Sequence, residues 1–317
     1  MSSVRLSIVS TLYQSAPWIV DFHRRCCAAA RRITADFEIV LVDDGSPDNS
    51  LDLAVSLYKT DHRVRVVSLS RNFGHHKAMM TGLAHARGEF VFLIDSDLEI
   101  EPEVLPEFFA RLEQSGADVV YGVQDSRQDG IVDRCAGLLF YTMFNVLSPH
   151  RLPVNVTTTR LMTRRFVSAL LEHREHEMII AGLWVITGFT QLPVAVSKIR
   201  RRKSTYSLAH MLVVLTNAVT AFSDRPLVVI FYAGVCISSL AGVLAAGLVA
   251  RRLFFGTLLP GWLSLIVSTW LLGGLIIFCL GVIGIYLSKV FIETKNRPYT
   301  IVKDIYEHPL GGAARDV

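Results

Sequence analysis

Phe90-Val91-Phe92-Leu93-Ile94-Asp95-Ser96-Asp97 is the stretch that decides the fold. An unbroken apolar run followed at once by acid predicts a strand buried on both faces that ends at a polar edge. Outward from it, short apolar runs alternate with amphipathic stretches, which predicts a mostly parallel α/β sheet with helices on both faces. The expected strands are Arg5–Ser10, Glu38–Val42, Val64–Ser68, Phe90–Ile94 and Asp118–Tyr121, and the expected helices are Pro17–Ile33, Asn49–Lys59, His75–Ala86 and Glu103–Gln114.

Acidic residues follow two of these strands. Ligands bind such sheets at the carboxyl ends of the strands, where the chain carries Asp43-Asp44-Gly45-Ser46 and Asp95-Ser96-Asp97. Two aspartates separated by one residue on an extended segment point to the same side and can share Mg²⁺ or Mn²⁺. An isolated Asp-x-Asp is more often a solvated turn, but the buried strand before Asp95 favours a metal site at Asp95 and Asp97. No Gly-x-Gly-x-x-Gly follows the first strand and no Walker sequence occurs, which disfavours ordinary dinucleotide and P-loop sites.

The apolar residues are concentrated near the C-terminus. Hydrophobic residues make up 51% of the 317 residues and charged residues 19%. No charge occurs between Arg225 and Arg251, or between Arg252 and Lys289. Each gap exceeds the ~20 residues that cross a ~30 Å hydrocarbon core as a helix. We therefore expect a transmembrane hairpin over 226–289, with spans near 227–249 and 263–288; two runs in series argue against buried core helices.

The remaining composition bears on location and partners. The N-terminus has no signal-peptide pattern, so we expect 1–205 and the tail 290–317 at the cytoplasmic face of the cell membrane. The segments 133–148 and 206–225 have the pattern of interfacial amphipathic helices, although packing on the domain's own core gives the same periodicity. Five cysteines form no disulfide or zinc spacing, and a net charge of +4 is too small to indicate nucleic acid. Glycines 273, 274, 281 and 284 suit close helix packing, so a homo-oligomer is a further expectation.

Taken in order, the motifs resemble those of the family 2 glycosyltransferases of GT-A fold. Within that family they look like the polyprenyl-phosphate glycosyltransferases related to dolichol-phosphate mannose synthase, and the resemblance covers nearly the whole chain. Its carriers are Val42-Asp-Asp-Gly-Ser46, Ser70-Arg-Asn-Phe-Gly-His-His-Lys-Ala78, Asp95-Ser-Asp-Leu98, Tyr121-Gly-Val123, Ser204-Thr-Tyr-Ser207, Phe222-Ser-Asp-Arg-Pro-Leu227 and Lys295-Asn-Arg-Pro-Tyr299.

The resemblance implies an inverting transfer of a sugar from a nucleotide donor, by analogy a UDP-sugar, to a polyprenyl (undecaprenyl) phosphate for cell-envelope glycan or lipopolysaccharide modification. It assigns Asp95 and Asp97 to the metal on the diphosphate, and Arg127 and Arg134 to the lipid phosphate. It assigns donor contacts to Thr11, Tyr13, Asp43, Asp44, Arg71, Asn72, Gly74, Lys77, Ser96, Arg202 and Lys203.

Several positions depart from the family pattern. Thr11-Leu-Tyr-Gln-Ser15 replaces Pro-Val-Tyr-Asn-Glu, and Thr157-Thr-Thr-Arg-Leu161 replaces Gly-Asp-Phe-Arg-Leu, so the aspartate that could serve as base is Thr158. A hydroxyl acceptor needs a base, whereas a phosphate monoester, with a second pKa of about 6, is already anionic. The lost aspartate is therefore compatible with a lipid-phosphate acceptor. Acids at Glu172, Glu175 and Glu177 could substitute for it, or form a solvated helix face.

Two other functions remain open. A non-catalytic nucleotide-sugar-binding scaffold would explain the altered segments at Thr11–Ser15 and Thr157–Thr159, although the retained Asp95 and Asp97 argue against it. A processive polysaccharide synthase of the same fold carries a Gln-x-x-Arg-Trp motif, which this sequence lacks.

Overall fold

The computed structural model describes residues 4–124, 155–175, 180–199, 225–255 and 261–308. The chain divides into two compact units. The first, which we call the sheet unit, consists of 1–141, 152–206 and 297–317, and the second, the helical unit, consists of 142–151 and 207–296.

The sheet unit is built on eight strands in the order β7-β5-β6-β4-β1-β2-β3-β8. Four neighbouring strands, β3, β2, β1 and β4, run parallel, which is the arrangement that their apolar runs predict. The strands are β1 (Leu6–Leu12), β2 (Phe37–Asp43), β3 (Val64–Leu69), β4 (Phe90–Leu93), β5 (Val119–Gln124), β6 (Val156–Thr163), β7 (Gln191–Val196) and β8 (Val302–Tyr306).

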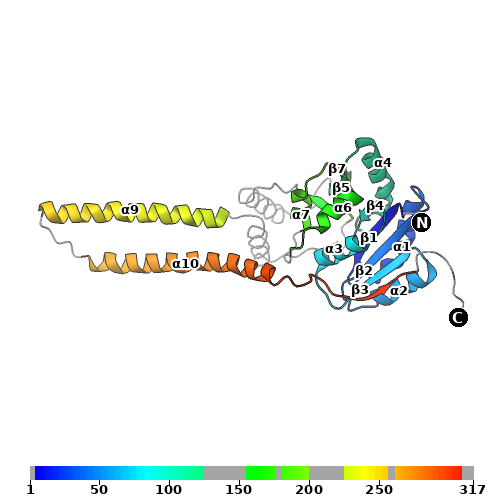
Figure 1. Ribbon diagram of the computed structural model, residues 1–317, viewed down its shortest axis with the longest axis horizontal. Helices are drawn as coiled ribbons and strands as arrows, with labels where there is room; N and C mark the ends of the chain where they lie inside the picture. Colours follow the sequence, from blue (N-terminus) through cyan, green and yellow to red (C-terminus); the bar gives the residue numbers. More distant parts are fainter. Residues whose placement is uncertain (1–3, 125–154, 176–179, 200–224, 256–260, 309–317) are drawn as a thin grey trace. The chain divides into compact units, whose positions relative to one another are not determined.

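Helices cover both faces of this sheet (Figure 1). Successive residues of one strand face opposite ways, so Ile8 joins one hydrophobic cluster and Val9 the other. The first cluster packs under α1, α2 and α4, and the second under α3, α6 and α7. Their bounds are α1 (Ile19–Arg31), α2 (Ser50–Thr60), α3 (His75–His85), the 3₁₀ turn η1 (Pro102–Val104), α4 (Leu105–Ser115), α6 (Arg164–Leu171) and α7 (Ile180–Ile186).

The predicted α/β fold is confirmed for the first 125 residues. Each of the five expected strands and four expected helices is present, with ends that shift by a few residues. Three strands, β6, β7 and β8, were not predicted. Strand β6 pairs antiparallel with β4 and β5, β7 pairs parallel with β5, and β8 pairs antiparallel with β3. The sheet is therefore mixed, with a parallel centre and antiparallel neighbours on both sides.

Strand β8 ties the C-terminal segment to the sheet unit. It lies antiparallel to β3, with Val66 opposite Tyr306. Glu307 beyond it accepts ion pairs from Arg65 and Arg87, each at 2.7 Å, and Arg65 also contacts the buried Glu38 at 3.2 Å. The tail that follows the long helices is thus an edge strand of the same sheet.

The helical unit contains α9 (Arg225–Phe255) and α10 (Trp262–Thr294). Among the described residues, one segment is long and apolar enough to cross a membrane: Ser268–Thr294, with a mean hydropathy of 2.4. The apolar part of α9, Leu227–Ala241, is shorter. The predicted pair of spans is therefore supported as one candidate span, and the complete transmembrane hairpin is not shown.

Other predictions fall on 125–154 and 200–224, outside the described residues. These are the interfacial segment 133–148, nearly all of 206–225, and the four basic residues assigned to phosphate contacts, Arg127, Arg134, Arg202 and Lys203.

Candidate active site

The carboxyl ends of the parallel strands bring the predicted acidic residues to one edge of the sheet. Asp43 closes β2, and Asp95 and Asp97 follow β4. The antiparallel partner β6 begins at the same edge, and its register places Leu93 opposite Arg160. Continued two residues forward from Leu93 and two residues back from Arg160, this antiparallel register brings Thr158 opposite Asp95. The Thr158 hydroxyl donates a hydrogen bond to Asp95 Oδ2.

A histidine that was not predicted as a site residue also approaches Asp95. His75 begins α3, its Nε2 lies 3.3 Å from Asp95 Oδ1, and its Nδ1 lies 3.0 Å from the Thr11 hydroxyl. Burial alone would raise the pKa of Asp95, but His75 and Thr158 outweigh it and lower that pKa. Among the described residues, Asp95 Oδ1 is buried and has His75 Nε2 at 3.3 Å as its neighbour, without a hydrogen bond of good geometry.

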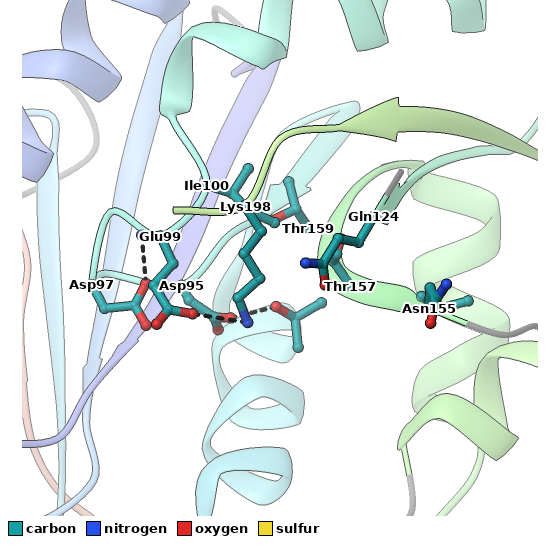
Figure 2. Close-up of a pocket in the computed structure, with 11 residues that line it drawn as sticks. Asp95, Asp97, Glu99, Ile100, Gln124, Asn155, Thr157, Thr159 and Lys198 are labelled. Atoms are coloured by element: carbon teal, nitrogen blue, oxygen red, sulfur yellow. Dashed lines mark hydrogen bonds and ion pairs between the residues drawn. The ribbon is translucent and has the colours of Figure 1, made fainter. Parts of the chain in front are cut away.

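Asp97 and Glu99 extend the acidic edge. Asp97 Oδ1 accepts a hydrogen bond from the Glu99 backbone at 3.0 Å. Burial raises the pKa of Asp97, and the charges of Asp95 and Glu99 raise it further. Lys198 follows β7 at the same edge and pairs with Glu99 at 2.8 Å. The site therefore holds three carboxyl groups and one ammonium within a small volume, as Figure 2 shows.

Two cavities meet at these carboxyl groups, because Asp95, Asp97 and Glu99 line both. The larger, of about 470 Å³, extends from them along the segment after β1 to the start of α1; its other lining residues are Thr11, Tyr13, Gln14, Ser15, Pro17, Trp18, His75 and Ser96. The smaller, of about 220 Å³, extends toward β5, β6 and Lys198 (Figure 2); its other lining residues are Ile100, Gln124, Asn155, Val156, Thr157, Thr158, Thr159 and Lys198. A ligand with one part in each cavity and a linking group beside the shared carboxyl groups would fit this arrangement.

Of the predicted donor residues, Thr11, Tyr13 and Ser96 line the larger cavity. Tyr13 is 47% exposed. Ser96 is buried, and its hydroxyl bonds the Thr11 carbonyl at 2.9 Å and the Ser15 hydroxyl at 3.0 Å. Ser96 therefore fixes the end of β1 against the segment that carries Asp95 and Asp97.

Asp43 and Asp44 have structural partners and line neither cavity. Asp43 accepts a hydrogen bond from the Ser46 backbone at 3.3 Å, and Asp44 accepts two, from Phe73 at 2.7 Å and Gly74 at 3.0 Å. Burial raises the pKa of both carboxyl groups. Asp44 thus holds the loop before α3, and its contact with a nucleotide stays a prediction.

That loop carries the other predicted donor residues. Arg71 and Asn72 are exposed, and the Arg71 guanidinium lies 4.2 Å from the Phe73 ring. Gly74, with φ of +101°, turns the chain into α3, whose first turn holds Lys77. The structure brings this loop beside Asp44, and its contact with phosphate stays a prediction.

The acidic edge fits a divalent metal by its chemistry. Mg²⁺ and Mn²⁺ prefer carboxylate oxygens and usually bind one or two carboxylates together with substrate phosphates. Asp95 offers a buried oxygen that lacks a hydrogen bond, and Asp97 lies beside it. An ion at Asp95 Oδ1 would replace its 3.3 Å contact with His75, while Thr158 would keep its hydrogen bond to Oδ2.

Five residues that line the two cavities were not predicted from the sequence: His75, Glu99, Gln124, Asn155 and Lys198. His75 lay within a quoted motif, and its place at the start of a helix after a strand end could have marked it. Lys198 had no such signal, because β7 was not predicted.

Comparison with known proteins identifies relatives of this chain. Residues 7–171 match the model of the family described as glycosyl transferase family 2. A Mycobacterium tuberculosis protein whose name places it among glycosyltransferases is 52% identical over 96% of this chain and 89% of its own length. The bactoprenol glucosyl transferase of Shigella phage SfII is 31% identical over 95% of this chain and 98% of its own length. The crystal structure of mannosyl-3-phosphoglycerate synthase from Rubrobacter xylanophilus has a TM-score of 0.48 and 19% identity, and covers 69% of this chain and 73% of that one.

Proposed function

Because this chain belongs to glycosyltransferase family 2, we propose that it moves a sugar from a nucleotide-sugar, a UDP-sugar in our assignment, to a polyprenyl phosphate at the cytoplasmic face of a membrane. The observation that carries this proposal is the pair of cavities that meet at Asp95 and Asp97. In our assignment the larger cavity takes the nucleotide, the smaller takes the sugar, and the diphosphate lies between them. The product would supply a cell-envelope glycan.

Asp95 and Asp97 would hold a Mg²⁺ or Mn²⁺ ion on the diphosphate. When bound, such an ion neutralises charge that develops on the leaving nucleoside diphosphate. The protein's own residues orient the carboxylate for this purpose. Thr158 donates to Asp95 Oδ2 and His75 lies beside Oδ1, so Asp95 is held from two sides.

The acceptor is assigned from the chemistry of Thr158. A phosphate oxygen attacks the anomeric carbon from the face opposite the diphosphate, the carbon–oxygen bond to the diphosphate breaks, and its electron pair leaves with the nucleotide. This acceptor oxygen carries no proton at neutral pH, so the step needs no base. At the position where the family pattern has an acid, the Thr158 hydroxyl instead donates a hydrogen bond to Asp95 Oδ2. A relative named for glucosyl transfer with bactoprenol supports the same acceptor class.

Among the described residues, Lys198 is the lysine that lines the smaller cavity, and we assign it a contact with the acceptor phosphate. It lines the smaller cavity opposite Thr157 and Thr158, and its present partner is Glu99. Arg127 and Arg134 keep their proposed role in holding the lipid phosphate, and Arg202 and Lys203 theirs in donor contacts.

Strand β8 supports two membrane crossings. It pairs with β3 in one sheet, so β3 and β8, which precede α9 and follow α10, would lie on the same side of a membrane. An even number of crossings must then separate them. Ser268–Thr294 can cross once, and α9 is the long helix that would supply the return. We therefore retain the transmembrane hairpin as a proposal.

The experiment is transfer of labelled sugar by the purified full-length chain with Mg²⁺ or Mn²⁺, a panel of nucleotide sugars, and either polyprenyl phosphate or the corresponding polyprenol. We expect a lipid-linked product with the phosphate and none with the alcohol. Equal use of the alcohol would contradict the acceptor assignment. Nucleotide binding without transfer from any donor would instead favour the non-catalytic scaffold, which the altered Thr157–Thr159 segment also allows.

A further inference from the structure

His23, Cys27 and Asp61 bring three side chains with metal-binding atoms together outside the two cavities. His23 and Cys27 lie one turn apart on the same side of α1, and Asp61 directly follows α2. His23 Nε2 lies 3.0 Å from Asp61 Oδ2, Cys27 Sγ lies 3.5 Å from His23 Nε2, and Cys27 Sγ lies 3.8 Å from Asp61 Oδ2.

These separations are close to the edges of a coordination tetrahedron. Zinc binds sulfur at about 2.3 Å, imidazole nitrogen at about 2.0–2.1 Å and carboxylate oxygen at about 2.0–2.2 Å. At tetrahedral angles, two such ligand atoms lie roughly 3.3–3.6 Å apart. The nitrogen–oxygen pair is slightly closer and the sulfur–oxygen pair slightly wider than that range. Shifts of a few tenths of an ångström would therefore admit an ion.

The surroundings suit a small, partly enclosed site. Cys27 is 6% exposed and Asp61 9%, and the His23 side chain is 16% exposed, which leaves a path for an ion and a fourth ligand from solvent. Arg63 binds Asp61 at both oxygens, at 2.8 and 2.9 Å. Of these two contacts, an ion at Oδ2 would compete only with the one to Oδ2. The contact from Arg63 to Oδ1 would remain and orient the carboxylate, as partners of metal-binding carboxylates commonly do.

We propose that His23, Cys27 and Asp61 bind one divalent ion of the zinc class, with water as the fourth ligand. The imidazole, thiolate and carboxylate donors match the borderline softness of Zn²⁺ better than that of Mg²⁺. The thiol proton passes to solvent when the ion binds, so one thiolate and one carboxylate balance the charge of the ion. The ion would join α1 to the turn between α2 and β3 and stabilise the fold without taking part in sugar transfer. The sequence predicted no zinc site because Asp61 is distant from the other two residues along the chain.

The test uses the full-length protein, stripped with a chelator and titrated with Co²⁺, which substitutes for Zn²⁺ and reports a thiolate ligand by a near-ultraviolet charge-transfer band. We expect this band at one equivalent per chain, and a rise in Tm when Zn²⁺ replaces Co²⁺. Cys27→Ala should abolish the band. His23→Gln should weaken Co²⁺ binding by at least about 100-fold, the upper end of the effect of losing an outer-shell partner.

Cys26→Ala is the matched control, because Cys26 is the adjacent buried thiol but belongs to the hydrophobic core. It should keep the band, as should Asp97→Asn, which separates this site from the proposed active site. Absence of the band in wild-type protein would show instead a hydrogen-bonded His–Asp–Arg cluster that binds no ion. Persistence of the band in Cys27→Ala would show that another thiolate holds the ion. Either result would overturn the proposal. Sugar transfer by the wild-type protein would be unaffected by that outcome.

Discussion

Thr158→Val removes one hydroxyl from the proposed active site and keeps the shape of the side chain. The hydroxyl donates to Asp95 Oδ2, and hydrogen bonds to charged groups contribute about 1.5–3 kcal/mol. Since each 1.4 kcal/mol is about tenfold in an equilibrium constant, the loss corresponds to roughly 10–150-fold. Loss of a residue that orients a metal ligand typically lowers metal affinity by about 10–100-fold, so the two routes agree.

We therefore expect the Mn²⁺ concentration that gives half-maximal sugar transfer to rise by about 10–100-fold in Thr158→Val. The rate at saturating Mn²⁺ should recover to within a few-fold of wild type, because Thr158 contacts the carboxylate and is assigned no proton transfer. The assay is initial-rate transfer to polyprenyl phosphate across a Mn²⁺ titration.

Thr159→Val is the matched control. Thr159 lines the same cavity, but its buried hydroxyl has no hydrogen-bond partner among the described residues, so its replacement should leave the Mn²⁺ dependence unchanged. An unchanged Mn²⁺ dependence in Thr158→Val would refute the orienting role. A rate that stays low at saturating Mn²⁺ would instead indicate that Thr158 takes part in the chemical step.

Three further predictions concern the framework. Glu307→Gln breaks two ion pairs of the C-terminal strand at a partly exposed carboxylate. We expect the free energy of unfolding to fall by about 1 kcal/mol and the Tm to fall by about 2–4 °C in thermal unfolding. An unchanged Tm would argue that the tail is not part of the sheet. Gly45→Ala would place a Cβ atom 2.5 Å from the Arg71 backbone, so we expect weakened UDP binding by calorimetry; Gly116→Ala, at a similar positive φ but with open space around it, should leave UDP binding unchanged. At Asp61, burial raises the pKa, but hydrogen bonds from Arg63 and His23 outweigh it and lower that pKa. In chelator-treated protein this carboxylate therefore stabilises the fold above about pH 4 and loses that effect as the pH falls. The Tm deficit of Asp61→Asn, measured without metal, should be largest near neutral pH and shrink in acid; a deficit independent of pH would contradict the role given to the Arg63 pair.

The parallel core could be predicted because its signals are local. An apolar run such as Phe90–Ile94 followed by acid specifies a strand and its polar end within a few residues, and the helices between strands show their own periodicity. Strand β8 could not be predicted in this way. Its partner β3 lies more than 200 residues earlier, and only the return of the chain after α10 brings them together.

Part of the candidate site has a local signal of the same kind. Asp95 and Asp97 were identified from their place after a strand, and both line the cavities. The bond from Thr158 to Asp95 depends on the register between β4 and β6, which short-range patterns do not contain. Asp44 looked like a ligand residue from its position, yet its two oxygens bind the backbone of the loop before α3.

The account rests on sugar transfer at the carboxylates that join the two cavities. The most direct test is the initial rate of lipid-linked sugar formation from UDP-sugar and polyprenyl phosphate by Asp97→Asn, with wild type and the exposed helix variant Asp52→Asn measured alongside. We predict that Asp97→Asn forms no detectable product while remaining folded, and that Asp52→Asn matches wild type. Near-normal turnover in Asp97→Asn would contradict the central claim.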